Sequence, residues 1–433
     1  MSLLKKSISI FTVSWIQLPI GIISNIIAIR YLGAEGRGFV VYFISIFTVI
    51  SVLGAFGIPT AIIYFFQKKE FSISKLFFYF LLTISLFIFL SLFIFLNISN
   101  IYSYIFQNIT INKYYLFFGF LISFLTMLLT FFHSSFLGSG DTKKYNSLIL
   151  INVIVYFFSV VILLTVLDFG VLGAIICNIV SLSISNVLAI YYIYSDLNRR
   201  DFIFKIDEYS KIINYALRRY PSSIIPVFMN QLPNLLIGSL LNITALGYYS
   251  VATTAFNGLN SIPKSINTLL FGKASKVSFT SSAELCAKVS RILFLSVFSL
   301  SITLSVLAYF IIPLIFGKDF INSVAPAIIL MISVTFIGVA ASIESYLLSQ
   351  DRPGILTIVN IFGALIVCIS SPLLVNILNI QGMALSLFLA RFLVFIILIY
   401  LFFVFSKMKP LSLLVVPFSE LKYYYLKLVS FKN

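Results

Sequence analysis

Long apolar segments follow one another from residue 8 to residue 406, with short polar loops between them. Many of these segments reach roughly 20 residues, the length that an α-helix needs to cross the hydrocarbon core of a bilayer. A chain inside a bilayer must satisfy its backbone hydrogen bonds internally, and a helix does so within each segment. The sequence therefore predicts an all-α protein that crosses a membrane many times.

The composition agrees with this prediction, because 61% of the residues are hydrophobic and 10% are charged, whereas soluble domains are about 25% charged. A net charge of +16 could indicate a nucleic-acid partner, but the basic residues lie between apolar segments and not in one patch. We therefore expect no nucleic-acid partner. The cysteines Cys177, Cys286 and Cys368 lack the spacing of a disulfide framework or a metal site, so we expect no metal and no other cofactor.

The apolar pattern predicts twelve spans, at approximately 8–30, 39–65, 75–97, 114–137, 147–167, 171–194, 217–240, 247–271, 289–315, 323–349, 354–377 and 382–406. They imply four parts: an N-terminal six-helix bundle (1–194), a cytoplasmic basic connector (195–216), a C-terminal six-helix bundle (217–406) and a cytoplasmic interfacial tail (407–433).

The distribution of Lys and Arg predicts the orientation. If the N-terminus is inside, the outer loops hold few of the 29 basic residues: Arg30, Arg37, Lys113 and Lys318. Cytoplasmic loops carry an excess of Lys and Arg. We therefore expect a multi-pass protein of a bacterial inner membrane with both termini in the cytoplasm.

Short patterns recur about 210 residues apart and in the same order. Tyr31-Leu32-Gly33 has a partner in Leu246-Gly247-Tyr248, and the pattern that ends the fourth span, 137–141, has a partner at the end of the tenth, 348–351. An even number of spans separates the copies, so both halves have the same orientation. The sequence predicts two bundles related by an axis along the membrane normal, with a cavity between them.

Polar side chains recur at spacings of three and four in the predicted eighth span, which places them on one helical stripe. Such stripes are unfavourable against lipid and should face protein or water. We expect them to line a hydrated cavity; interhelical hydrogen bonding in a packed bundle is the alternative. The predicted cavity residues come from the first, seventh and eighth spans: Gln17, Asn230, Asn234, Asn257, Asn260 and Asn267.

Four basic residues lie within or at the start of C-terminal spans: Arg218, Arg219, Lys264 and Arg391. An Arg or Lys in the centre of a span costs about 2.5–3.5 kcal/mol on insertion scales, and both residues suit phosphate oxygens. We expect these four to form a cationic substrate-binding cavity, although Lys264 could also extend to the interface and the Arg pair could anchor its helix. Glu344 in the tenth span could pair with them, act as a gate or carry a proton.

Three segments carry a family resemblance: 30–38 (RYLGAEGRG), 217–221 (LRRYP) and 246–249 (LGYY). They resemble polysaccharide repeat-unit (O-antigen type) flippases of the multidrug, oligosaccharidyl-lipid and polysaccharide exporter superfamily. The resemblance implies two six-helix lobes and alternating access. It implies a substrate, an undecaprenyl-diphosphate-linked oligosaccharide, that moves from the inner to the outer leaflet. The implied partners are this lipid-linked oligosaccharide, membrane lipids and polysaccharide polymerase machinery.

The sequence also leaves open a precursor flippase for peptidoglycan or teichoic acid, and two other classes of function. A drug or cation exporter of the same superfamily would prefer acidic residues deep in the bundles, and Glu344 stands alone there. A membrane-embedded polymerase or glycosyltransferase usually has large outer loops or clustered acids and histidines. This chain has a single His and short outer loops. We find no nucleotide loop or nucleophile motif, so the sequence favours a transporter over an enzyme.

Overall fold

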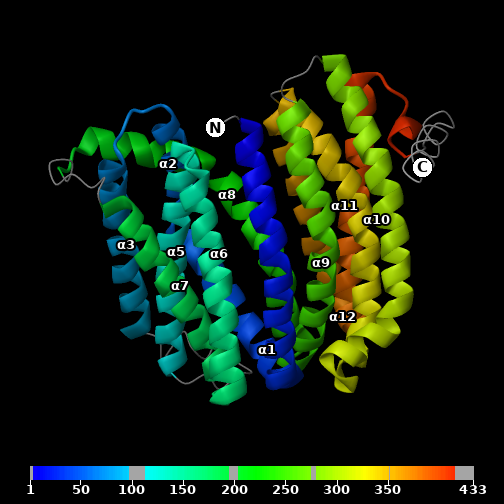
Figure 1. Ribbon diagram of the computed structural model, residues 1–433, viewed down its shortest axis with the longest axis horizontal. Coiled ribbons are helices and arrows are strands. Elements are labelled where there is room, and N and C mark those ends of the chain that lie inside the picture. Colours follow the sequence, from blue (N-terminus) through cyan, green and yellow to red (C-terminus); the bar gives the residue numbers. More distant parts are fainter. Residues whose placement is uncertain (1–2, 97–112, 195–202, 275–278, 351, 415–433) are drawn as a thin grey trace, which may run out of the picture. The chain divides into compact units, whose positions relative to one another are not determined.

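The computed structural model describes residues 3–96, 113–194, 203–274, 279–350 and 352–414. In these ranges the backbone is helical apart from short turns (Figure 1). The helices form two compact units. The N-terminal unit comprises Thr12–Ser250, and the C-terminal unit comprises Val251–Asn433 together with Met1–Phe11.

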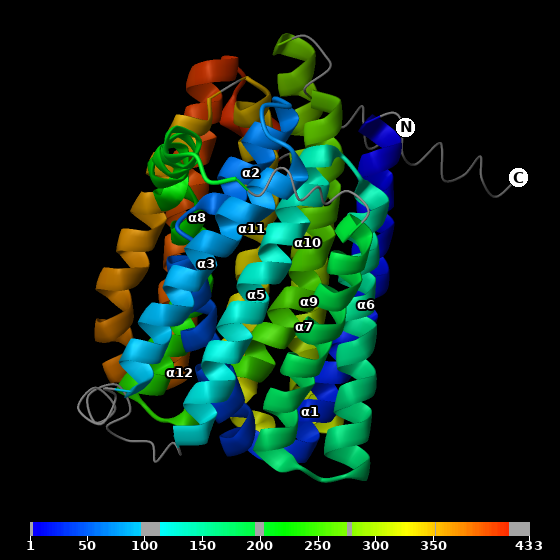
Figure 2. The same cartoon turned by 90° about the vertical axis from the view of Figure 1, so that its left-hand side faces the viewer.

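The N-terminal unit is a helical bundle. Its helices α3, α5, α6 and α7 lie side by side in both views (Figures 1 and 2). In chain order the elements are α1 (Leu3–Gly54), α2 (Ile58–Gln67), α3 (Ile73–Leu96), α5 (Lys113–Ser139), α6 (Thr142–Val160), the π-helix η1 (Val161–Val166), α7 (Gly170–Tyr194), α8 (Ile206–Leu240) and the first residues of α9 (Ile243–Ala274).

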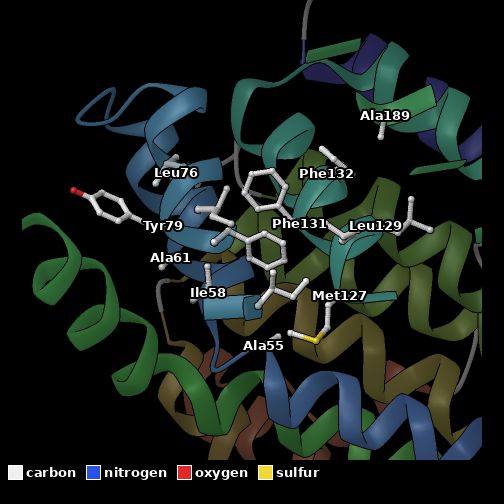
Figure 3. Packing of buried hydrophobic residues seen from close by; sticks show 14 of the residues in the cluster. Ala55, Ile58, Ala61, Leu76, Tyr79, Met127, Leu129, Phe131, Phe132 and Ala189 are labelled. Carbon is white, nitrogen blue, oxygen red and sulfur yellow. The ribbon is translucent and has the colours of Figure 1, made fainter. Parts of the chain in front are cut away.

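The core of the N-terminal unit is rich in aromatic rings from α2, α3 and α5 (Figure 3). Phe131 and Phe132 are fully buried, and the ring of Phe131 stacks on Phe80 with centroids 4.5 Å apart. Lipid tails are as apolar as these rings, so helix association in a membrane depends on close packing more than on exclusion from water. The interlocking rings supply that packing.

The C-terminal unit contains the rest of α9, then α10 (Phe279–Phe316), the short 3-10 helix η3 (Lys318–Ser323), α11 (Val324–Ser349), α12 (Pro353–Ser406) and η4 (Pro410–Leu413). Helix α11 packs against both α10 and α12. Its side chains Ile343, Tyr346 and Leu347 are fully buried in a core that also includes Phe402. Helix α11 therefore lies between α10 and α12 and is the central helix of these three.

Two of the long helices each hold two predicted spans joined at a single non-helical residue. In α1 this residue is Gly33, with φ 64° and ψ −175°. In α12 it is Asn379, with φ 53° and ψ −133°. Both positive φ values lie in the region that Gly and Asn occupy more readily than other residues. A further break separates α1 from α2, so the predicted span 39–65 is not continuous: the chain turns at Gly57, with φ 72°.

In the described part of the chain, eight helical segments are long and apolar enough to cross a membrane. Two of them, Thr12–Gly54 and Gly354–Ser406, are the double helices that turn at Gly33 and Asn379. Shorter apolar helices lie at Ile58–Gln67 and Ile73–Ile88. The chain is therefore a multi-pass membrane protein, and the predicted fold class, an all-α polytopic protein with about twelve spans, is confirmed.

The two compact units divide the chain at Ser250, whereas the sequence suggested a division at a connector of residues 195–216. Residues 195–202 lie outside the described part, and residues 206–216 form the first turns of α8, which packs with the N-terminal unit. The interfacial helix predicted for the tail also falls outside the described residues from Val415 onward. Repeats in the sequence give the order of the spans, but not which bundle a given helix packs against.

Candidate functional site

Arg391 lies in the second half of α12, where three helices of the C-terminal unit meet around its side chain. Its Nη1 donates a hydrogen bond to Oγ of Ser333 in α11 at 2.7 Å. Its guanidinium carbon lies 4.3 Å from the ring centroid of Phe256 in α9. Cation–π contacts are worth about 0.5–2 kcal/mol, more when they are desolvated. The hydroxyl of Ser333 and the ring of Phe256 together orient the guanidinium.

The polar stripe of α9 separates into an exposed edge and a buried edge. Asn257 and Lys264 are exposed, whereas Asn260 and Asn267 are each 6% exposed. Successive residues turn by about 100° in a helix, so positions 257 and 264 lie about 20° apart, while 260 and 267 are rotated about 40–80° from them. A spacing of three and four places all of them within one arc, but the arc spans the border between surface and core.

Asn267 is a structural contact between α9 and α11. Its Nδ2 donates to the carbonyl oxygen of Gly338 at 3.3 Å, and its Oδ1 accepts from Oγ of Ser342 at 2.8 Å. Oγ of Ser345 donates to the backbone oxygen of Asn267 at 3.4 Å. At this position interhelical hydrogen bonding, the alternative weighed for the stripe, describes what the side chain does. The Oδ1 atom of Asn260 is buried and has no hydrogen-bond partner.

Arg218, Arg219 and Asn230 of α8 are exposed in the N-terminal unit. Positions 219 and 230 lie about 20° apart around an ideal helix, so they share one face of α8. Asn234 is half-buried, and its Nδ2 donates to Oγ of Ser45 in α1 at 3.0 Å. On this face Arg219 and Asn230 are thus exposed, and Asn234 joins α8 to α1.

Gln17 and Glu344 are both half-buried. Gln17 lies in the first half of α1, two residues before Pro19, which removes a backbone donor from that helix. Glu344 lies in α11 between the buried residues Ile343 and Ser345. Both positions therefore have one side in the protein interior and one side open.

Arg37, which the sequence predicts on the outer side, is part of a helix and makes hydrogen bonds within the N-terminal unit. The structure places it in α1, four residues after the turn at Gly33. Its Nη2 donates to Oδ1 of Asn25 at 2.7 Å, and it also hydrogen-bonds Tyr156 of α6. A single turn at Gly33 allows the helix to resume at once, so Arg37 belongs to the helix although the predicted second span begins at residue 39.

Ion pairs join the first turns of α8 to the α2–α3 region of the N-terminal unit. Nζ of Lys75 lies 2.6 Å from Oε2 of Glu208, and Nζ of Lys211 lies 2.7 Å from Oε2 of Glu70. The hydroxyl of Tyr79 donates to the same Glu208 carboxylate at 2.9 Å, and its ring points away from the Phe131 cluster in Figure 3. The hydrogen bond from Lys211 lowers the pKa of Glu70. Burial raises the pKa of Glu208, but the hydrogen bonds from Lys75 and Tyr79 outweigh it and the pKa is lowered.

Among the residues that the structure describes, no three His, Cys, Asp or Glu side chains are grouped so that they could hold a metal ion. The features that the described residues do offer are basic side chains and amides, exposed or half-buried on α8, α9 and α12. Such groups can bind an anion through charge-assisted hydrogen bonds.

Comparison with known proteins gives one family match. The family described as "Polysaccharide biosynthesis protein" matches residues 27–325, which is more than half of the chain. Among curated protein sequences, none matches the chain.

Solved structures show the same fold at low sequence identity. The lipid II flippase MurJ in an inward closed conformation aligns with TM-score 0.74 and 15% identity, over 92% of this chain and 90% of that one. The MATE multidrug transporter DinF-BH aligns with TM-score 0.67 and 15% identity, over 94% and 98%. A MOP superfamily transporter from Pyrococcus furiosus, described by the reverse polarity of its binding pocket, aligns with TM-score 0.63 and 13% identity, over 95% and 96%.

At these identities the neighbours show that the chain has the fold they share. The family match covers the segments from which the resemblance was drawn, including Arg30–Gly38 and Leu217–Pro221. The chain belongs to the family of polysaccharide biosynthesis proteins.

Proposed function

We propose that this protein is a flippase that moves an undecaprenyl-diphosphate-linked oligosaccharide, the repeat unit of a surface polysaccharide such as O-antigen, from the inner to the outer leaflet by alternating access. The observation that carries the proposal is Arg391, a half-buried cation in α12 whose guanidinium is oriented by the hydroxyl of Ser333 and the ring of Phe256. A site that keeps a guanidinium charged within a membrane favours an anionic ligand.

The diphosphate group is the part of such a substrate that the basic residues would bind. Arg218 and Arg219 are exposed in the N-terminal unit, and Lys264 is exposed in the C-terminal unit on α9, the helix that also carries Phe256. Guanidinium groups can make bidentate contacts to phosphate oxygens. Asn230 and Asn257, both exposed, offer amide groups suited to sugar hydroxyls.

The transmembrane potential would favour outward movement of this substrate. In the predicted orientation, with both termini in the cytoplasm of a bacterial inner membrane, the diphosphate moves from the negative to the positive side. Each negative charge gains about 2.3 kcal/mol per 100 mV. Glu344 would then act as a gate or coupling group rather than as the source of driving force, and the released product would be consumed by polysaccharide polymerase machinery.

The names of the neighbours give two kinds of substrate. MurJ is a lipid II flippase, and DinF-BH is a multidrug transporter. The cation balance of this chain favours the first of these chemistries. A drug exporter would be favoured by carboxylates in the spans, and Glu344 is the carboxylate that the sequence offers there.

A leaflet-accessibility assay for the lipid-linked sugar, made in cells depleted of the protein and complemented with variants, tests the proposal. We expect depletion to hold the sugar on the inner face and Arg391→Ala to restore little transport. Arg352→Ala is the matched control, because Arg352 also lies over a phenylalanine, Phe405, at 4.0 Å but precedes the first turn of α12. Normal outer-face delivery in depleted cells would refute the flippase function.

A further inference from the structure

Two glycines bring the backbones of α1 and α9 into direct contact within the N-terminal unit. A Cβ atom on Gly38 would lie 1.8 Å from the carbonyl oxygen of Ile243, and a Cβ atom on Gly247 would lie 1.8 Å from the carbonyl oxygen of Ala34. No side chain fits at either position unless the helices separate. Small residues allow helices to approach this closely in membranes.

Two further contacts continue this crossing along α1. The Cδ2 atom of Tyr42 lies 2.3 Å from the Cβ position of Gly238 in α8, and Ser45 accepts the 3.0 Å hydrogen bond from Asn234. Positions 38, 42 and 45 are spaced by four and three, so they share one face of α1. We call this set the outer clasp: residues 38–45 of α1 on one side, and residues 234–247 of α8 and α9 on the other.

The opposite end of α8 is held by a different kind of contact. The rings of Tyr64 and Tyr215 stack with centroids 4.1 Å apart, and the Lys211–Glu70 and Lys75–Glu208 ion pairs lie close by in sequence. We call these contacts the inner anchor. Interlocked rings and charge-assisted hydrogen bonds resist separation more strongly than neutral contacts do.

The outer clasp is built to part easily. The contacts described above are backbone against glycine, a ring over glycine and one hydrogen bond between neutral side chains, and such bonds are weak inside membranes. No side chains interdigitate at the Gly38–Gly247 crossing, so separation requires no repacking there. Pro226 and Pro233 of α8 lie between the anchor and the crossing. Each removes a backbone hydrogen bond, which makes this stretch the natural place for α8 to bend.

The crossing also joins the two halves of the internal repeat. Gly38 immediately precedes the predicted second span, and Gly247 begins the predicted eighth span, which is the counterpart of the second in the repeat. The crossing therefore joins a helix to its own counterpart. Arg37, one residue from Gly38, fixes this part of α1 through Asn25 and Tyr156, so any opening moves α8 and α9 and leaves α1 in place.

We propose that the outer clasp is the gate on the outer face, closed in this structure, and that it opens when α8 bends between Pro226 and Pro233 while the inner anchor holds. The proposal deepens the flippase function and rests on it, and it rests on the orientation that the basic residues predict. It assigns the gate to residues outside the cationic set.

Reversible cross-linking tests whether the clasp must open. In a Cys368→Ser background we pair Glu35→Cys with Asn242→Cys, two exposed positions that adjoin the crossing residues Ala34 and Ile243. A short thiosulfonate linker should stop delivery of the lipid-linked sugar, and reductant should restore it. The matched control pairs Glu70→Cys with Lys211→Cys across the inner anchor, and its cross-link should leave delivery unchanged.

A second measurement is independent of the substrate. Ser45→Cys, a nearly isosteric change at a position 2% exposed, reports clasp opening through labelling by a membrane-impermeant maleimide added outside. Gly247→Ala should raise this labelling severalfold, because the closed clasp has no room for the new methyl group. Gly21→Ala, which meets no atom within 4 Å, should leave it unchanged.

The outcomes separate the gate from the flippase function. Continued delivery through the cross-linked clasp, or unchanged labelling in folded Gly247→Ala, would show that the crossing is a fixed pivot and would overturn the gate. A block by the inner cross-link would overturn the anchor. If the wild type delivers no lipid-linked sugar but Gly247→Ala still raises labelling, the gate stands and the proposed substrate does not.

Discussion

Arg37 donates a 2.7 Å hydrogen bond to Asn25 across the turn at Gly33, so one guanidinium joins the two halves of α1. Hydrogen bonds to charged groups contribute about 1.5–3 kcal/mol. We therefore expect Arg37→Ala to lower the unfolding temperature of the purified protein by several degrees. Arg30→Ala, at an exposed position in the same helix, should change it little. The comparison is made by fluorescence-monitored melting in detergent, and equal melting of the two variants would contradict a structural role for Arg37.

The two residues that contact the Arg391 guanidinium, Ser333 and Phe256, should both affect transport. Ser333→Ala removes the hydroxyl that accepts from Nη1, and Phe256→Leu removes the ring face. We expect each to reduce delivery of the lipid-linked sugar about tenfold, as loss of one charge-assisted hydrogen bond or cation–π contact would, with near-normal expression. Ser299→Ala on the exposed side of α10 is the control. A wild-type rate of sugar delivery in both Ser333→Ala and Phe256→Leu would show that the orientation of Arg391 does not matter.

The two edges of the α9 stripe should respond oppositely to the same substitution. Asn267→Leu leaves the carbonyl of Gly338 and the hydroxyl of Ser342 in α11 without their hydrogen bonds to this side chain, and should destabilise the protein by about 1–3 kcal/mol. Asn257→Leu changes an exposed amide and should reduce transport while leaving the melting temperature unchanged. Parallel melting and leaflet-accessibility measurements distinguish them. A stability loss in Asn257→Leu would mean that its side chain packs in the native state.

The ion pairs of the inner anchor predict a loss of stability in acid. The pKa values of Glu70 and Glu208 are lowered below 4.5, so both carboxylates stabilise the folded state above the unfolded pKa, and this contribution disappears as the pH falls through the folded pKa. We expect the melting temperature to fall as the pH is lowered through 4.5, the unfolded pKa, and below it, and less steeply in Glu70→Gln/Glu208→Gln. Glu284→Gln, exposed on α10, is the control. If the melting temperature of the double variant fell with pH as steeply as that of the wild type, these two carboxylates would not be the cause of the acid instability.

Much of the fold was predictable because a bilayer leaves few choices. The lengths of the apolar segments predicted the helices, and the polar residues between the segments predicted where each helix ends. The spans that are joined only by Gly33 and Asn379 were therefore separated correctly. The break at Gly57 was missed because hydrophobicity runs through it, and its cause is a close approach: a Cβ there would lie 2.6 Å from the carbonyl oxygen of Ala216. A distant backbone does not appear in a local pattern.

The candidate site was less predictable. Spacing selects a helical face but does not say whether that face ends in the core, which is why Asn257 and Asn267 fell in one predicted stripe and have different environments. Ser333 and Phe256 were not singled out, because a serine and a phenylalanine in apolar spans carry no signal of their own. Their importance comes from the arginine that a third helix brings to them.

Helix α9 starts in one compact unit and ends in the other without interruption, and α8 packs with the unit that precedes it in the chain. Chimeras between relatives are therefore sensitive to where they are cut. A junction at residues 195–202 would combine α8 from one parent with an α1–α3 surface from another, so a mosaic protein needs both surfaces from the same ancestor. The halves of this sequence are repeated, but they are not interchangeable parts.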